Sequence, residues 1–366
     1  MNDECIIHGD ENIGSVPPSG GRGLEFMARA LQLARMGSGN VAPNPMVGCV
    51  VVHLERGIIG EGYHQTYGGL HAEVNAIQSV KDIGLLKKSS LYVTLEPCSH
   101  FGKTPPCADL IIKMGIPQVF VCNLDPNPLV AGKGNEKLKN AGIEVQTGIL
   151  EKEGQALNRF FFYFHKYNRP FITLKWAQTS DGFIAREDGS SKWISGPESR
   201  QLVHKWRAEH QAIWVGKNTL LMDNPRLTVR DWKGQTPIRI VLDRNLDLPK
   251  DLTVFSDSSA TTWIFNNVVE KDQGHVKYIL LNPAIDAIEN ILNHLRFVNI
   301  QSLFVEGGSK LINSLISSGN WNETLIFTGS GKFKTGIQAP LLTNGSLVQV
   351  DKIGQDMLQT WTRTKG

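Results

Sequence analysis

Residues 93–107 read VTLEPCSHFGKTPPC, and a His-Ala-Glu triplet at 71–73 precedes them in the chain. Cys98 and Cys107 supply two thiolates and His71 one imidazole, which leaves one position of a tetrahedral zinc ion open for water. Glu73, on the first turn of a helix, can face the metal without binding it and carry a proton. Helix N-termini, where both halves of the pattern lie, favour thiolates. The pattern therefore predicts a catalytic zinc site.

The spacing of these residues narrows the chemistry. H-x-E followed by P-C-x-x-C is the signature of zinc nucleobase deaminases. This chain has the first half and widens the second, with eight residues between Cys98 and Cys107. Cys49 and Cys122 lie in apolar strands and are interpreted as core residues. The five cysteines do not form the pattern of a disulfide framework.

Length and composition indicate two globular domains. The chain has 366 residues, of which 41% are hydrophobic and 20% charged. Its net charge of +3 is spread thinly, which argues against a nucleic acid or a membrane surface as partner. No apolar stretch is long enough to span a bilayer, and the acidic start at residues 1–4 is unlike a signal peptide. We expect a cytoplasmic enzyme.

Alternating strands and helices predict an α/β fold in both halves. We expect a flexible leader at 1–23, a first domain at 24–168 and a second at 169–366, with the boundary at Pro170. The aromatic run at 157–167 is interpreted as a helix packed against both domains. Expected helices cover 24–35, 107–114, 135–140, 199–208 and 285–297, and others begin near 71 and at 309. Expected strands cover 47–52, 58–61, 91–95, 119–122, 143–146, 171–176, 212–215, 238–242, 277–281 and 302–305.

The second half has one weak signal of its own. It lacks a G-x-G-x-x-G motif, but Glu306-Gly307-Gly308 lies between a strand and a helix N-terminus. Backbone amides at such a turn suit a phosphate or pyrophosphate. A plain strand-to-helix turn is the alternative.

Longer blocks resemble one family. In the first half they are 42–50 (APNPMVGCV), 62–64 (GYH), 71–73, 93–100, 102–107 and 125–128 (DPNP). In the second half they are 174–182 (LKWAQTSDG), 191–195 (SKWIS), 207–209 (RAE), 219–230 (TLLMDNPRLTVR) and 306–308. In this order they resemble the bifunctional deaminase/reductases of riboflavin biosynthesis, over about residues 24–366. The wide spacing of the two cysteines is that family's own form.

The resemblance implies a three-layer domain like cytidine deaminase, followed by a domain like dihydrofolate reductase that uses NADPH. The implied substrate is a small molecule, a diaminopyrimidinone carrying a ribosylamino 5-phosphate. By this match zinc is held by His71, Cys98 and Cys107, and Glu73 protonates the leaving ammonia. Asn44 contacts the substrate. The loop at 99–106 closes over the base or phosphate through His100 and Lys103, unless these two are merely solvated.

The resemblance also assigns contacts in the second domain. Those to the substrate are Ser191, Arg207, Leu227, Arg230 and Glu306. Those to the cofactor are Ala177, Trp193, Thr219, Asp223, Arg244, Gly308, Ser309, Lys310 and Leu311. A guanidinium binds phosphate well, so Arg207 and Arg230 suit the 5-phosphate and Arg244 the cofactor's 2′-phosphate. No residue is named as catalytic for reduction, because positioning can supply most of it.

Two residues differ from the family's usual pattern, and two alternative functions remain to be compared with the structure. Trp176 and Gln178 are large where the family often shows threonine or serine. One rival function is a deaminase of nucleic acid, which would leave the second half unexplained. The other is a non-catalytic zinc module, in which His64 or His100 would be a fourth ligand. The expected partners are the small-molecule substrate and further copies of this chain.

Overall fold

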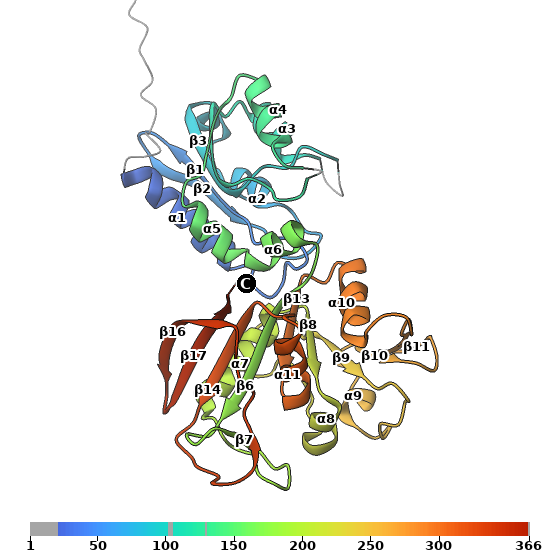
Figure 1. Cartoon of the computed structure of the whole chain (residues 1–366). Helices are drawn as coiled ribbons and strands as arrows, with labels where there is room; N and C mark the ends of the chain where they lie inside the picture. The colour runs from blue at the N-terminus through green and yellow to red at the C-terminus, as the bar shows by residue number, and fades with distance from the viewer. Residues whose placement is uncertain (1–20, 102–104, 129, 365–366) are drawn as a thin grey trace, which may run out of the picture. The chain divides into compact units, whose positions relative to one another are not determined.

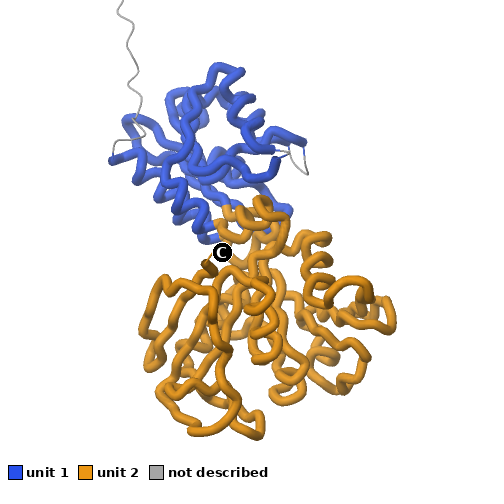
Figure 2. The backbone as a smooth tube through the Cα atoms, viewed as in Figure 1, with its two compact units in different colours: residues 1–36, 47–157 blue, residues 37–46, 158–366 orange. Residues whose placement is uncertain are grey.

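The computed structural model describes residues 21–101, 105–128 and 130–364. They form two compact units, one from the described residues of 21–36 and 47–157 and the other from 37–46 and 158–364 (Figure 2). Most of the expected leader lies outside the described residues. The first helix begins at Gly21, so residues 21–23 are its first turn. None of the helices in the described ranges has the length and apolar character needed to span a bilayer.

Unit 1 is a five-stranded sheet with helices on both faces (Figure 1). The strands are β1 (Gly48–His53), β2 (Gly57–Tyr63), β3 (Ser89–Leu95), β4 (Gln118–Asn123) and β5 (Glu144–Thr147), in the order β2-β1-β3-β4-β5. The helices are α1 (Gly21–Arg35), α2 (Ala72–Gln78), the 3₁₀ helix η1 (Ile83–Lys88), α3 (Cys107–Met114), α4 (Lys133–Asn140) and α5 (Glu151–Leu157). β1 is antiparallel to β2 and β3, and β3, β4 and β5 are parallel.

Side chains that alternate along the strands of unit 1 build a core on each face. Val51 and Val93 pack with α2 and α3, whereas Val50 and Tyr92 pack with α1. Gly48 permits the close approach of α1, because a Cβ there would lie 2.0 Å from a helix carbonyl oxygen. This three-layer arrangement puts the N-termini of α2 and α3 near the end of β3, where the candidate zinc ligands lie.

Unit 2 has a ten-stranded sheet in the order β11-β12-β10-β9-β8-β13-β6-β14-β17-β16 and a small β15-β7 pair. The strands are β6 (Phe171–Gln178), β7 (Phe183–Ala185), β8 (Ala212–Val215), β9 (Ile238–Leu242), β10 (Thr262–Asn266), β11 (Lys271–Gln273), β12 (Val276–Leu280), β13 (Ser302–Glu306), β14 (Glu323–Thr328), β15 (Ile337–Gln338), β16 (Gly345–Ile353) and β17 (Asp356–Arg363). The helices are α6 (Arg159–Tyr167), α7 (Pro197–Glu209), α8 (Lys217–Asp223), α9 (Thr253–Ser256), α10 (Ala287–Phe297) and α11 (Ser309–Ser317).

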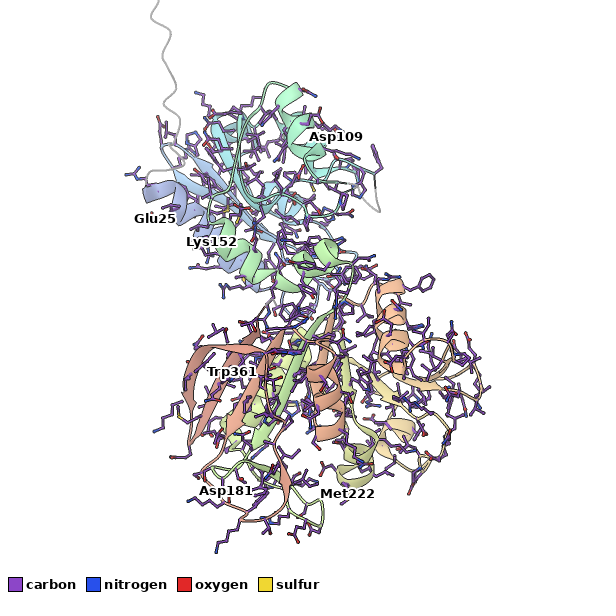
Figure 3. The ribbon with its side chains drawn as sticks, viewed as in Figure 1. Glu25, Asp109, Lys152, Asp181, Met222 and Trp361 are labelled. Carbon is purple, nitrogen blue, oxygen red and sulfur yellow. The ribbon has the colours of Figure 1, made fainter. Side chains whose placement is uncertain are left out.

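The central strands of unit 2 are parallel and buried on both faces, as their apolar sequences predict. α10 and α11 cover one face, and α7, α8 and α9 cover the other. Figure 3 labels Met222 on α8 and Trp361 on β17. Three of the ten strands, β11, β16 and β17, are antiparallel to their neighbours. Most of the expected cofactor contacts lie in or next to α8, which follows β8, and α11, which follows β13.

Some elements differ from the sequence prediction. The aromatic run forms a helix as expected, α6, whereas the preceding α5 was not predicted and is separated from it by Asn158. Its side chain bonds to both backbone polar groups of Met46, each at 2.8 Å. The sequence predicted no strand beyond residue 305 and missed β10, whereas the structure adds β14 to β17. The edge strand β16 is mostly exposed, so it lacks the apolar alternation that marks a strand.

Candidate active sites

Three metal-ligand side chains meet at the end of the parallel strands in unit 1. His71 is the N-cap of α2, and Cys107 is the first residue of α3. Cys98 follows β3 by three residues. Their ligand atoms all lie within 4.8 Å of one another. The structure thus brings together the residues that the sequence predicted as a zinc site.

The spacing within this group fits zinc. His71 Nδ1 lies 3.6 Å from Cys98 Sγ and 3.3 Å from Cys107 Sγ. A tetrahedral zinc ion with Zn–N of about 2.0 Å and Zn–S of about 2.3 Å separates these atoms by about 3.5 Å. Among the described residues no further His, Cys, Asp or Glu joins the group. Three ligands suit an open, catalytic site rather than a closed structural one.

Electrostatics at the group favour a thiolate and a nearby proton carrier. A hydrogen bond from the Cys107 thiol is the largest influence that lowers the pKa of Cys98. The Cys107 backbone nitrogen, which lies 3.3 Å from Cys98 Sγ, donates a second bond that lowers it further. Glu73 is 3% exposed, and its carboxyl interacts with Cys98, His71 and Cys107. Burial raises the pKa of Glu73 to about 7, and the charge on Cys98 adds to the effect. Glu73 therefore faces the group without belonging to it.

The two histidines considered as a fourth ligand lie outside the group. The His64 ring stands edge-on to that of His71 at 5.7 Å, and its Nδ1 is 2.9 Å from the Leu70 carbonyl oxygen. His100 is described but is not within reach of the other ligand atoms. Lys103 lies outside the described residues. This coordination count argues against the closed, non-catalytic module.

Glu96 is a buried carboxylate that the sequence reasoning did not single out. It accepts hydrogen bonds from the backbone nitrogens of Gly132 and Gly134, both at 2.9 Å, and of Asp125 and Asn135 at 3.3 and 3.2 Å. Glu96, two residues before Cys98 in the chain, therefore fixes Asp125 and the start of α4. The Glu-Pro-Cys order, with an acid before a ligand, was the only sequence signal.

A second polar cluster is buried in unit 2. The guanidinium of Arg207 makes a bidentate pair with Glu306, with N–O distances of 2.6 and 2.8 Å. Burial alone would raise the pKa of Glu306, but the charge and hydrogen bonds of Arg207 lower it. Lys175 lies beside Glu306 in the register of β6 and β13. Loss of water lowers the pKa of the Lys175 amine, and Glu306 partly opposes this.

The two arginines expected to bind phosphate, Arg207 and Arg230, both contact Thr228, but they differ in how many of their nitrogens are bonded to the protein. Arg207 also donates to the Thr228 carbonyl oxygen at 3.2 Å, so three of its nitrogens have protein partners. Arg230 is exposed and donates to the Thr228 hydroxyl at 3.3 Å. Leu227 is buried beside them with φ of 59°. Arg230 is therefore the better placed of the two for an anion.

The Gly-Gly turn after β13 forms a tight cradle with the start of α8. A Cβ at Gly308 would lie 3.3 Å from both Thr219 Oγ1 and the Cα of Gly216. Gly308 has φ of 84° and caps α11, whose first residues are Ser309, Lys310 and Leu311. Thr219 and Gly308, expected to contact the cofactor, are thus brought together at the carboxyl ends of neighbouring parallel strands.

The other residues expected to contact the cofactor lie on several different elements of unit 2. Ala177 is on β6, on the face opposite Trp176. Asp223 ends α8, where burial raises its pKa and Lys192 opposes the shift. Arg244 is exposed just after β9. Trp193 is 71% exposed in the loop before α7, and Ser191 lies in the same loop.

Comparison with known protein families decides between the rival functions. The RibD C-terminal domain matches residues 170–358, and the cytidine and deoxycytidylate deaminase zinc-binding region matches residues 22–123. The riboflavin biosynthesis protein RibD of Bacillus amyloliquefaciens is 42% identical over 356 residues, covering 92% of this chain and 95% of that one. This chain belongs to the RibD family.

Other members of the family are similar to this chain over most of its length. The RibD protein of Aquifex aeolicus is 45% identical over 307 residues, covering 82% of this chain and 85% of its own. A solved deaminase/reductase from Thermotoga maritima is 39% identical with a TM-score of 0.85, covering 94% of this chain and 99% of its own. The predicted fold class is confirmed: a cytidine-deaminase-like domain precedes a dihydrofolate-reductase-like RibD reductase domain.

Family membership also fixes the general function. The chain is a bifunctional deaminase/reductase of riboflavin biosynthesis, with a zinc-binding deaminase domain and an NADPH-using reductase domain. It acts on a small molecule, so the nucleic-acid deaminase is not favoured. The sequence reasoning named neither Lys175 nor Glu96 as a functional residue. Lys175 was hidden because only the strand register shows that it neighbours Glu306.

Proposed function

We propose that unit 1 removes the exocyclic amine of 2,5-diamino-6-ribosylamino-4(3H)-pyrimidinone 5′-phosphate. The second unit would then reduce the ribosyl group with NADPH, giving 5-amino-6-ribitylaminouracil 5′-phosphate. The observation that carries the proposal is the open group of His71, Cys98 and Cys107 with Glu73 facing it. The solved relative from Thermotoga maritima is named for the matching pair of activities.

In the deamination, His71, Cys98 and Cys107 would hold zinc, which supplies the Lewis acidity that makes a water molecule nucleophilic near neutral pH. Glu73 would take up a proton and deliver it to the departing amine. Its burial supports this role, because it raises the pKa of Glu73 to about 7, and a group that titrates near neutral pH can both accept and release a proton. We also assign Asn44 to substrate contact. Asn44 lies in a turn in which its backbone nitrogen donates to the Val41 carbonyl oxygen at 2.9 Å.

In the reduction, we assign binding of the 5-phosphate to Arg230. We assign contacts with the sugar to Arg207 and Glu306, which also form an ion pair with each other. Ser191 and Leu227 complete the substrate contacts. The exposed guanidinium of Arg230 supports this division, since three nitrogens of Arg207 already donate to Glu306 and Thr228. The proposed cofactor contacts are Ala177, Trp193, Thr219, Asp223, Arg244, Gly308, Ser309, Lys310 and Leu311.

We further propose a cytoplasmic enzyme without a nucleic-acid or membrane partner, with domain limits at 24–168 and 169–366. Buried free thiols at Cys49 and Cys122 suit a reducing compartment. We also propose a homo-oligomer. The edge strand β16 supports it, because Leu347, Val348 and Val350 are 46–60% exposed along an edge paired on one side by β17.

The Glu73→Gln variant tests the deaminase assignment. It should keep one zinc per chain but lose deamination by roughly 10²–10⁴-fold, as expected for removal of a general acid/base. Glu61→Gln is the matched control, since Glu61 pairs with Arg29 in the same unit and is partly exposed. Near wild-type deamination by Glu73→Gln would refute the role.

The Arg230→Gln variant tests the substrate class. With the deaminated substrate it should raise KM by about 10-fold or more, because a charge-assisted bond to phosphate is lost. With the same compound lacking its phosphate, variant and wild type should show equal KM. An equal loss on both compounds would remove Arg230 from the phosphate site.

A further inference from the structure

Trp193 stands out in unit 2 as a large exposed ring. It is 71% exposed, yet the segment that carries it is tied down on two sides. Because the core does not surround an exposed indole, its orientation depends on the residues that hold its backbone and contact its ring. Under the proposed function this ring contacts the cofactor, and the following inference rests on that function.

Arg200 is the first tie. Its guanidinium carbon lies 4.5 Å from the centre of the Trp193 ring, in the range of a cation–π contact. Its Nη1 also donates to the Ser195 carbonyl oxygen at 2.7 Å. One side chain thus covers a face of the indole and fixes the backbone two residues further on.

Asp356 is the second tie, and it comes from the far end of the chain. This carboxylate begins β17 and is 3% exposed. A single oxygen, Oδ2, accepts from the Gly196 nitrogen at 2.7 Å and from the Ser199 hydroxyl at 2.6 Å. Both donors belong to the start of α7. Asp356 therefore anchors the point where the Trp193 segment enters the helix.

The backbone before that point is also closely packed. A Cβ at Gly329 would lie 2.0 Å from the Ile194 carbonyl oxygen, so the segment rests directly on this glycine. With Gly329 below it, Arg200 over one indole face and Asp356 at its end, residues 193–196 have little freedom. Arg200 covers one face of the indole, while Trp193 as a whole stays 71% exposed.

We propose that Arg200 and Asp356 are positioning residues for NADPH, which act by holding Trp193 in the orientation that receives the cofactor. Neither residue needs to touch the cofactor. Their loss should weaken cofactor binding because the indole then samples other orientations before binding. Once NADPH is saturating, the reacting groups return to the same geometry and turnover recovers.

Steady-state reduction of the deaminated substrate by the full chain tests this. Asp356→Ala should raise KM for NADPH by about 10-fold, and Arg200→Ala by about 3-fold. In both variants kcat, KM for the pyrimidine substrate and the deamination rate should stay near wild type. Asp356→Asn should recover much of the loss, since one amide oxygen can still accept both bonds. Asp351→Asn, at a half-buried carboxylate on β16, and Arg296→Ala, at an exposed guanidinium on α10, are the controls.

The outcomes separate the proposal from the function on which it rests. Trp193→Ala should raise KM for NADPH at least as far as Asp356→Ala, and an unchanged KM in that variant would refute the cofactor role of Trp193. If Trp193→Ala raises KM but the Arg200 and Asp356 variants match their controls, the positioning role is wrong. Should Asp356→Ala fold poorly, Ser199→Ala removes one bond to the carboxylate and should show a smaller rise. A parallel fall of kcat for every substrate would mark Asp356 as merely structural.

Discussion

Trp176 and Gln178 lie on the same face of β6, since side chains two residues apart in a strand share a face. Trp176 is 3% exposed in the core, and its indole Nε1 donates to Gln178 Oε1 at 3.0 Å. A buried indole N–H without a partner would be costly. The two large side chains are therefore compatible, because the glutamine oxygen accepts the hydrogen bond that the buried indole needs to donate.

We predict that Gln178→Leu lowers the unfolding free energy of unit 2 by about 1–3 kcal/mol, because it leaves the indole N–H unsatisfied. Gln178→Glu, which keeps an acceptor, should lose less. Urea unfolding measures the difference. Gln349→Leu on the exposed strand β16 is the control. An unfolding free energy of Gln178→Leu equal to that of the control would contradict this explanation.

Single residues with fixed chemistry were the most predictable part of the sites. Zinc ligands have few possible types and spacings, so His71, Cys98 and Cys107 were predicted as a group, and the structure brings them together. Lys175 was not predicted, because its importance comes from Glu306 on another strand. Such a pair depends on sheet register, which depends on the whole core.

At the scale of one element, the end of α7 holds an ionisable group that stays neutral. His210 Nδ1 donates to the Trp206 carbonyl oxygen at 2.7 Å, and Nε2 accepts from the Thr173 hydroxyl at 3.1 Å. Burial lowers the pKa of His210 to about 3, with the Trp206 carbonyl opposing the shift. The unfolded chain, with a histidine pKa of about 6.5, takes up a proton at a pH where the folded chain does not.

Stability of unit 2 should therefore fall as the pH drops from about 6.5 toward 3. The His210 contribution is up to about 1.4 kcal/mol per pH unit, because the unfolded state binds one more proton. Above pH 6.5 this contribution is constant. His210→Gln should reduce the pH slope of the urea midpoint in that window. A variant with the wild-type slope would show that His210 is not responsible.

Elements were predictable where local sequence decides them. β1 and β8 are short apolar runs with β-branched residues, and both were predicted. β16 was missed, because an exposed edge strand lacks alternation. The helix α5 was also missed, and it ends next to Asn158, which is fixed by Met46, far away in sequence. Long-range contacts decide such boundaries, and no local pattern records them.

At the scale of the whole molecule, each cluster lies entirely within one unit. His71, Cys98 and Cys107 are in unit 1, whereas Arg207 and Glu306 are in unit 2. The segment 37–46 belongs with unit 2, where the Gln235 nitrogen donates to the Gly39 carbonyl oxygen at 3.2 Å. The linear sequence alone does not reveal this grouping, since it cannot show which distant residues meet.

We predict that Cys107→Ser loses zinc and deamination but keeps NADPH-dependent reduction of the deaminated substrate. The reason is that the sulfur of Cys107 lies 3.3 Å from His71 Nδ1 and its backbone nitrogen donates to Cys98 Sγ, both within unit 1. Metal analysis and separate assays of the two activities measure this. Cys49→Ser, which changes a buried thiol outside the cluster, is the control. Equal loss of both activities would show that the two units do not work independently.

The most direct test of the bifunctional account gives the purified chain the diaminopyrimidinone ribosylamino phosphate together with NADPH. Ammonia release and NADPH absorbance are followed in the same sample. The account predicts that ammonia appears first and that NADPH is then consumed in an equal amount. Ammonia without NADPH consumption, or neither change in a chain with zinc bound, would contradict it.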